Sequence, residues 1–165
     1  MRLHIFACRC ARYTATGRDV VPFPATAPTT RLDVIMVTIV VPLDGSAYAE
    51  RALRPAFAIA ARLESARVLL LTCSPDDIDG AQQELDDRAR LYSDVAGVET
   101  RLVASGDPAE VILATVATEA DATLCMATHG RGGIRATVMG SVLTQLVCRS
   151  TRPVILVGPR CRTAL

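Results

Sequence analysis

Apolar residues in this chain occur in short runs, and segments with helical spacing separate these runs. The run at residues 37–43 (VTIVVPL) is rich in β-branched residues and almost continuous. This pattern is typical of a parallel strand that is buried on both faces. Later runs have the same character, and together they predict five strands, at residues 37–43, 68–73, 98–103, 122–126 and 154–157.

Between the strands, apolar residues recur every three or four positions, which indicates helices with one buried face. The first helix follows a turn at residues 44–46, and its apolar face consists of Leu53, Ala56, Phe57, Ala60 and Leu63. A second helix is predicted at residues 81–92. A short last helix is predicted at residues 142–149, and Ser141 is its expected N-cap.

The clearest helix start lies at residues 106–110 (GDPAE), and this helix is predicted to run to about residue 119. Asp107 can cap the helix, Pro108 suits the first helical position, and Glu110 stands where a capping box needs its carboxylate.

Five strands that alternate with helices predict an open α/β fold, in which a five-stranded parallel sheet has helices on both faces. Sheets of this kind bind ligands beyond the carboxyl ends of their strands, where the strand order reverses. We therefore expect a site formed by Asp44, Cys73 and residues 126–133.

The chain divides into one domain and two flanking segments. Residues 1–35 contain three prolines and no sustained period of apolar residues, so we predict a disordered extension. The domain is expected at residues 36–158, and residues 159–165 form a C-terminal tail.

The composition excludes several classes of protein. All 18 basic residues are Arg, and from residue 36 onward the acidic residues outnumber them by two, which argues against a nucleic-acid partner. Without Lys the chain cannot form the Walker A loop of a P-loop NTPase. The longest nearly apolar run, residues 34–43, has only about half the length of a membrane-spanning helix, so no membrane association is expected.

The six cysteines form no CxxC pair, and three of them (Cys73, Cys125 and Cys148) lie in apolar segments. Buried free cysteine behaves as a small hydrophobic residue, so we interpret the chain as a protein of the reducing cytoplasm. We assign no metal site.

The segment most informative about function is residues 126–142 (MATHGRGGIRATVMGSV). It begins at a strand end, passes through a glycine-rich loop and ends at a predicted helix start. Glycines allow a ligand to approach the backbone amides closely, and a helix N-terminus attracts anions, so a phosphate could bind here without any Lys. Arg131 could add positive charge. The glycines alone could equally form only a loop and a helix cap.

Asp44 provides a second and independent feature of the expected site. It ends the first predicted strand and would lie across from the glycine-rich segment, where it could meet an adenosine group or a phosphate-bound Mg²⁺. A lone Asp after a strand is often only a helix cap. The two features together favour a nucleotide site.

At this point the sequence resembles the universal stress protein family. Members carry a strand that ends in Asp, as in the run VVPLD that closes at Asp44. They also carry a signature of G-x-x-G, nine residues and then G-S or G-T. This chain has ATHG at residues 127–130, nine residues, and then Gly140-Ser141. Segments at residues 106–109, 120–122 and 152–157 are also similar, so the resemblance covers about residues 36–158.

The resemblance implies a sheet of order 3-2-1-4-5, an adenine nucleotide alpha-hydrolase-like fold, and an ATP-binding regulatory protein of the stress response. It implies that Mg²⁺ accompanies the ATP. It also implies a homodimer paired through the last strand, Val154–Val157, whose apolar edge would otherwise be exposed.

Matching the family motif residue by residue gives the expected binding site. Pro42, Leu43, Asp44 and Cys73 would line the adenosine end. Met126, Ala127, His129, Gly130 and Arg131 would follow the ribose and the phosphates, and Gly140, Ser141 and Val142 would supply phosphate-binding amides and a hydroxyl. The chain departs from the signature at one position, because Ala127 replaces its first glycine. The added methyl group would crowd the ligand if this residue needed a positive φ, and it would be harmless in extended backbone.

No residue is assigned a catalytic role, since no carboxylate pair and no Ser/His/Asp order stands out, and any ATP hydrolysis is expected to be slow. Three interpretations are open. The chain could be an ATP-binding signalling module, a nucleotide-free interaction dimer of the same fold, or an enzyme on a related α/β fold. The enzyme class usually brings a further catalytic domain, for which this chain has no room.

Overall fold

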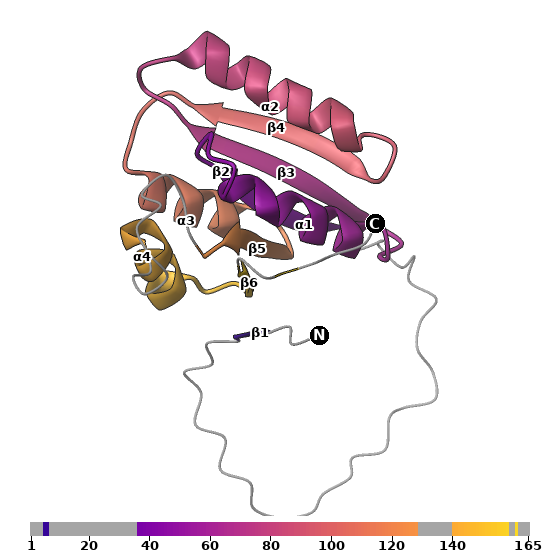
Figure 1. Ribbon diagram of the computed structural model, residues 1–165. Coiled ribbons are helices and arrows are strands. Elements are labelled where there is room, and N and C mark those ends of the chain that lie inside the picture. Colours follow the sequence, from indigo (N-terminus) through magenta and orange to yellow (C-terminus); the bar gives the residue numbers. More distant parts are fainter. Residues whose placement is uncertain (1–4, 7–35, 129–139, 159–160, 162–165) are drawn as a thin grey trace, which may run out of the picture.

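The computed structural model describes residues 5–6, 36–128, 140–158 and 161. Five parallel strands form its sheet in the order β6-β5-β2-β3-β4 (Figure 1). If the five predicted strands are numbered along the chain and the sheet is read from β4 to β6, the order is 3-2-1-4-5. The predicted fold is therefore confirmed. The strands are β2 (Val37–Leu43), β3 (Ala66–Cys73), β4 (Gly97–Val103), β5 (Ala122–Ala127) and β6 (Val154–Val157).

A sixth strand, β1 (Ile5–Phe6), pairs with β6 in the antiparallel direction. Ile5 lies opposite Ile155 and Phe6 lies opposite Val154. The predicted disordered extension therefore includes one short strand, and the rest of residues 1–35 lies outside the described residues. The expectation that β6 has an unpaired outer edge is wrong for this part of the strand.

Helices cover both faces of the sheet, as predicted. The 3-10 helix η1 (Ala49–Ala52) leads into α1 (Leu53–Ala60), which shares one face with α2 (Ile78–Tyr92). The helices α3 (Pro108–Thr118) and α4 (Ser141–Arg149) cover the other face (Figure 1). Because α1 ends at Ala60, Leu63 lies beyond the helix and is 41% exposed, so its predicted place on the buried face is wrong. No helix of the described residues is long and apolar enough to cross a membrane.

The capping residues at the starts of α3 and α4 agree only in part with the prediction. Asp107 caps α3 by accepting hydrogen bonds from the amides of Ala109 (2.9 Å) and Glu110 (3.2 Å), as expected. The predicted capping box is wrong, because the Glu110 carboxylate instead accepts a hydrogen bond from Arg149 of α4 (3.1 Å). The helix α4 begins at Ser141 itself, so Gly140 occupies the cap position in place of Ser141.

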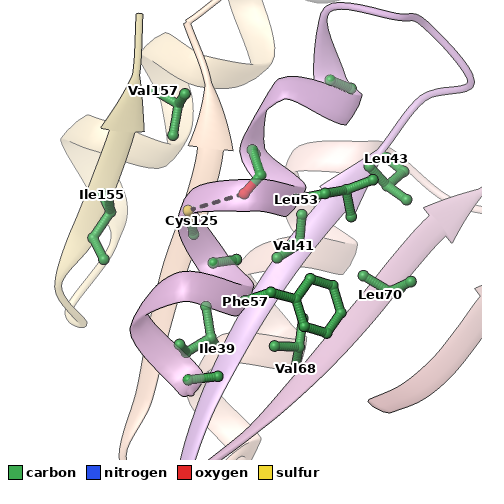
Figure 2. Close-up of a cluster of buried hydrophobic side chains, with 14 of the residues drawn as sticks. Ile39, Val41, Leu43, Leu53, Phe57, Val68, Leu70, Cys125, Ile155 and Val157 are labelled. Atoms are coloured by element: carbon green, nitrogen blue, oxygen red, sulfur yellow. Dashed lines mark hydrogen bonds between the residues drawn. The ribbon is translucent and has the colours of Figure 1, made fainter. Parts of the chain in front are cut away.

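Each central strand buries its side chains on both faces of the sheet. Val40 and Leu69 are fully buried on the α3 and α4 face, and the residues on either side of them are buried on the α1 and α2 face. This alternation under two helical layers explains the continuous apolar runs in the sequence. Figure 2 shows the residues on the α1 and α2 face, where Ile39, Val41, Val68 and Leu70 surround Phe57 of α1.

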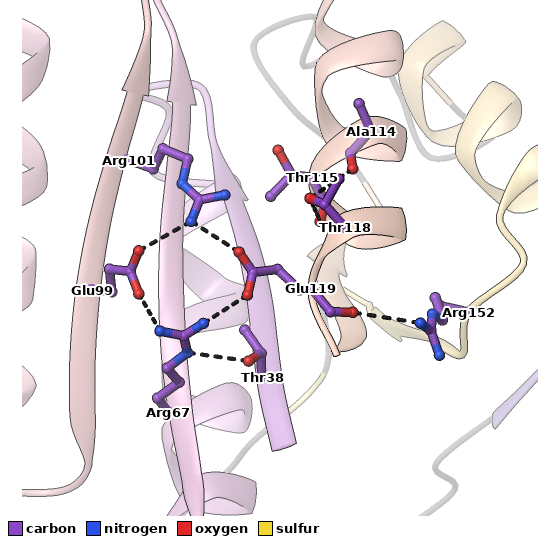
Figure 3. A network of polar contacts seen from close by, with 9 residues as sticks. All are labelled: Thr38, Arg67, Glu99, Arg101, Ala114, Thr115, Thr118, Glu119 and Arg152. Atoms are coloured by element: carbon purple, nitrogen blue, oxygen red, sulfur yellow. Dashed lines mark hydrogen bonds and ion pairs between the residues drawn. The ribbon is translucent and has the colours of Figure 1, made fainter. Parts of the chain in front are cut away.

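Charged residues replace apolar ones where β3 and β4 meet on the α3 and α4 face (Figure 3). Glu119, which follows α3 and is 12% exposed, binds Arg67 (2.6 Å) and Arg101 (2.9 Å) through its two oxygens. Both arginines also pair with Glu99. Arg67 donates a further hydrogen bond to the buried hydroxyl of Thr38 (3.2 Å). Two positive and two negative side chains therefore neutralise one another around one buried carboxylate.

We expect Glu119→Gln to lower the free energy of unfolding by about 1–2 kcal/mol, because two arginines lose a shared, largely buried carboxylate while remaining partly hydrated themselves. Urea unfolding followed by circular dichroism measures this loss. The matched control is Glu110→Gln, which breaks a solvent-exposed pair and should cause no measurable change. Equal losses in the two variants would contradict the role given to the network.

Candidate functional site

The strand order reverses between β2 and β5. From β2 the chain proceeds through α1 to β3, and from β4 it returns through α3 to β5 on the other side of β2. The two connections lie on opposite faces of the sheet, so neither covers the carboxyl ends of β2 and β5. The ends of these two strands are therefore the place where a ligand site is expected in this fold.

The pairing between β2 and β5 stops before either strand ends. Residues 38–40 pair with residues 122–124, and no later pair joins the two strands within the described residues. Both strands continue for three more residues, and each keeps its pairing with its other neighbour, β3 or β6. Backbone groups at the carboxyl ends of β2 and β5 therefore do not satisfy each other. The early end of this pairing was not predicted, although Pro42, which has no N–H to donate, is a signal that could have indicated it.

Three predicted residues, Pro42, Leu43 and Asp44, lie at the end of β2. Pro42 stands beyond the last β2–β5 pair, in a part of the strand where a residue without an N–H is tolerated. Leu43 is buried and its carbonyl accepts a hydrogen bond from the Thr72 hydroxyl at 3.2 Å.

Asp44 organises the turn that leads into η1. Its Oδ1 accepts hydrogen bonds from the amide of Ser46 (3.0 Å) and from the hydroxyl of the same residue (2.5 Å). Gly45 between them has φ 74°, a conformation that glycine adopts without strain. Asp44 is thus not the cap of η1, whose N-cap position is Tyr48, and its carboxyl group is instead held by the turn at the strand end.

Cys73 ends β3, beside β2. Burial raises the pKa of its thiol, and the nearby carboxylate of Asp107 raises it further. The residue is therefore a neutral thiol at physiological pH and can serve as part of a wall, while it is a poor nucleophile.

Met126 and Ala127 are buried at the end of β5. Ala127 pairs with Val157 in the parallel ladder, and Asp121 is the one non-glycine residue of the described part that has a positive φ. The backbone of Ala127 is thus that of a strand, and its methyl group costs no backbone strain. The residue after it, Thr128, donates its amide to Val157 O (3.0 Å), which extends β5 by one more contact. Thr128 lies within the predicted site segment 126–133, although the residue-by-residue match to the family motif gave it no role.

Val142 and Leu143, at the start of α4, belong to the same apolar cluster as Met126 of β5. Gly140 has φ −57°, which any residue can adopt, and a Cβ added to it would meet no atom of the described residues within 4 Å. No described side chain caps the amides of this helix start. The fold itself therefore does not require a glycine at this position.

The remaining predicted residues, His129, Gly130 and Arg131, lie outside the described residues. Among the described ones, no group of three His, Cys, Asp or Glu side chains could hold a metal ion. The other nine predicted residues lie at the carboxyl ends of β2, β3 and β5 and at the start of α4.

The profile of the universal stress protein family matches residues 36–158 of this sequence. The chain belongs to the universal stress protein family. The match spans the whole sheet except β1, together with all four α-helices. No curated protein matches the chain.

Solved structures of universal stress proteins share this fold. The hypothetical protein MJ0577 superposes with a TM-score of 0.68 at 24% identity, covering 78% of this chain and all of its own. The universal stress protein UspA from Lactobacillus plantarum has a TM-score of 0.65 at 17% identity, covering 73% of this chain and 97% of its own. A universal stress protein solved in complex with cAMP has a TM-score of 0.62 at 24% identity, covering 75% of this chain and 98% of its own.

Cys125 lies just before the candidate site on β5 and anchors η1 to the sheet. It is fully buried, and its thiol donates a weak hydrogen bond to the carbonyl of Ala52, with the sulfur and oxygen 3.8 Å apart (Figure 2). Burial, together with a smaller effect of Cys161, raises the pKa of Cys125 to about 12.

We expect iodoacetamide at about pH 8 to modify the exposed Cys148 in the folded protein and to spare Cys125, because only thiolates react. Peptide mass spectrometry measures both sites, and in denaturant both should be labelled. The raised pKa also affects stability. Below the ordinary thiol pKa of 9.0 the residue adds no pH dependence. Above it, the unfolded thiol ionises first, so stability falls as the pH rises toward 12. Equal labelling of the two cysteines in the folded state would contradict this picture.

Proposed function

We propose that this universal stress protein binds ATP, with Mg²⁺, at the carboxyl ends of β2 and β5, and that it acts as a regulatory or signalling module in the stress response. The observation that carries the proposal is the start of α4. Gly140 leaves open space where a side chain would stand, although neither its backbone angles nor its neighbours among the described residues require glycine. A glycine at this position would allow a ligand to approach the backbone closely.

The phosphates would bind at this helix start. The first amides of an α-helix have no partner within the helix and carry the positive end of its dipole. In α4 these amides belong to Ser141 and the residues that follow, and no described side chain caps them. The exposed Ser141 could add its hydroxyl. Gly130, His129 and Arg131 are proposed to follow the phosphates from the glycine-rich segment.

The adenosine end would lie at the neighbouring strand ends. Pro42, Leu43 and the neutral thiol of Cys73 provide apolar surface for a base. Asp44 provides a carboxylate, which accepts hydrogen bonds from ribose hydroxyls or from an amino group. Its turn with Ser46 fixes that carboxylate before any ligand arrives.

The relative solved in complex with cAMP supports an adenine nucleotide as the ligand class, because that protein has the same fold and covers three quarters of this chain. ATP is preferred here over cAMP because a helix start with uncapped amides suits a chain of phosphates. We expect hydrolysis to be slow or absent, since none of the described site residues is placed as a general base.

We further propose that the protein works in the cytoplasm as a homodimer that pairs through β6. Cys73, Cys125 and Cys148 form no disulfide among the described residues, which fits a reducing compartment. The strand β6 is apolar along its whole length and lies at the end of the parallel sheet. Two copies related by a two-fold axis could pair such strands in the antiparallel direction.

Equilibrium dialysis with Mg·ATP should detect binding by the intact protein, and Gly140→Val should weaken it by at least about tenfold, since the side chain would fill the space left for the phosphates. Urea unfolding should be unchanged, because the added Cβ meets no described atom. The matched control is Gly97→Val at the start of β4, at the opposite end of the sheet, which should bind ATP normally.

Absence of binding at millimolar Mg·ATP would overturn the ATP proposal and leave a nucleotide-free dimer of the same fold. A parallel titration with cAMP distinguishes the two adenine nucleotides. Tighter binding of cAMP than of ATP would keep the site but contradict the ligand.

Leu156→Lys should abolish self-association, because it places a charge on the partly buried strand that forms the proposed interface. Sedimentation velocity over a range of concentrations gives the dimerisation constant. Leu91→Lys is the matched control, since Leu91 is 71% exposed on α2, and it should associate like the wild type. An unchanged dimerisation constant in Leu156→Lys would exclude the β6 interface.

A further inference from the structure

The outer edge of β6 is occupied by another part of the same chain. β1 pairs with the first half of β6, with Phe6 opposite Val154 and Ile5 opposite Ile155. The other edge of β6 is fully paired with β5 from Val154 to Val157. This strand therefore has one edge for a further partner, and β1 already lies on part of it.

The direction of the β1 pairing matters. A two-fold dimer that joins β6 to β6 must pair the strands antiparallel, because the symmetry axis reverses the strand direction. β1 is also antiparallel to β6. It thus uses the same edge, the same direction of pairing and the same backbone groups that a second copy would use. A self-pairing that is centred on this four-residue strand involves its first half as well as its second, so β1 and such a second copy exclude each other.

We propose that β1 is an intramolecular cap that competes with dimerisation, so that release of Ile5–Phe6 from β6 exposes the dimer edge. This inference rests on the β6 dimer proposed above and adds its regulation. The cap has an advantage over a second copy, because a segment on the same chain has an effective concentration of the order of millimolar. It is also easily displaced, since it is paired over only two residues.

Competition between β1 and a second copy for the β6 edge strongly changes the apparent dissociation constant of the dimer. Both edges must be open before two copies can pair, so the apparent dissociation constant is divided by the square of the open fraction. A cap closed about ten times as often as it is open would raise that constant about a hundredfold. A modification or partner that captures the N-terminal segment would therefore act as a switch of the oligomeric state.

The test compares the full-length wild type with the double variant Ile5→Pro/Phe6→Pro, in which the segment can no longer donate backbone hydrogen bonds to β6. The dimerisation constant is measured by sedimentation. The matched control is Thr14→Pro/Ala15→Pro, which makes the same change elsewhere in residues 1–35. Urea unfolding checks that the domain, whose family match begins at residue 36, is intact in each protein.

We expect the Ile5→Pro/Phe6→Pro variant to dimerise at least about tenfold more tightly than the wild type and the control, because its edge is open more often. In dilute samples below the dimerisation constant, the amide of Val154, which faces the β1 edge, should also exchange faster with deuterium. Adding Leu156→Lys to the variant should abolish the gain, which would place the new contact on β6.

The other outcomes overturn the inference in distinguishable ways. An unchanged dimerisation constant, with Leu156→Lys still disrupting the dimer, removes the cap and keeps the dimer. Weaker association of the variant means that the N-terminal segment supports the dimer, for example by exchange between copies, and again removes the cap. If neither protein associates at any concentration, the β6 dimer fails and its proposed regulation fails with it.

Discussion

The early end of the pairing between β2 and β5 is the constraint on which the candidate site depends. In a parallel sheet, neighbouring strands normally satisfy each other's backbone groups to their ends. Here the ladder stops after Val40 and Leu124, at the place where the chain reverses its order of strands. The last three residues of each strand are thereby released from one another, and the candidate site is proposed at these released ends. The position of the candidate site therefore follows from the strand order, whichever side chains occupy it.

The opposite end of the sheet is secured in a different way. Glu119 joins β3 and β4 through its carboxylate, while its backbone carbonyl accepts a hydrogen bond from Arg152, just before β6 (3.5 Å) (Figure 3). Glu119 thus connects the β3–β4 side of the sheet with the segment that leads into β6. The charges of the four side chains in this network cancel locally.

The five strands were predictable because burial on both faces leaves continuous apolar runs, and α3 was predictable because Asp107 and Pro108 mark its start. The errors have a common physical cause. The Glu110 carboxylate binds Arg149, which is 39 residues away, in place of the amide at the start of its own helix. No local pattern reveals that contact. The two residues of β1 are too few to show a period. The early end of the β2–β5 ladder has only one signal in the sequence, the proline at position 42, which lacks an N–H to donate.

Gly140 has a consequence for how such a protein can evolve. No described residue would contact a side chain at this position, so stability of the described part alone would let other residues replace this glycine. Its persistence in a lineage would have to be maintained by a bound ligand. Its replacement would give a stable domain without that ligand in one mutational step. Sensing and scaffolding forms of one fold can therefore be close neighbours in sequence, separated by a position whose change leaves the folding free energy untouched.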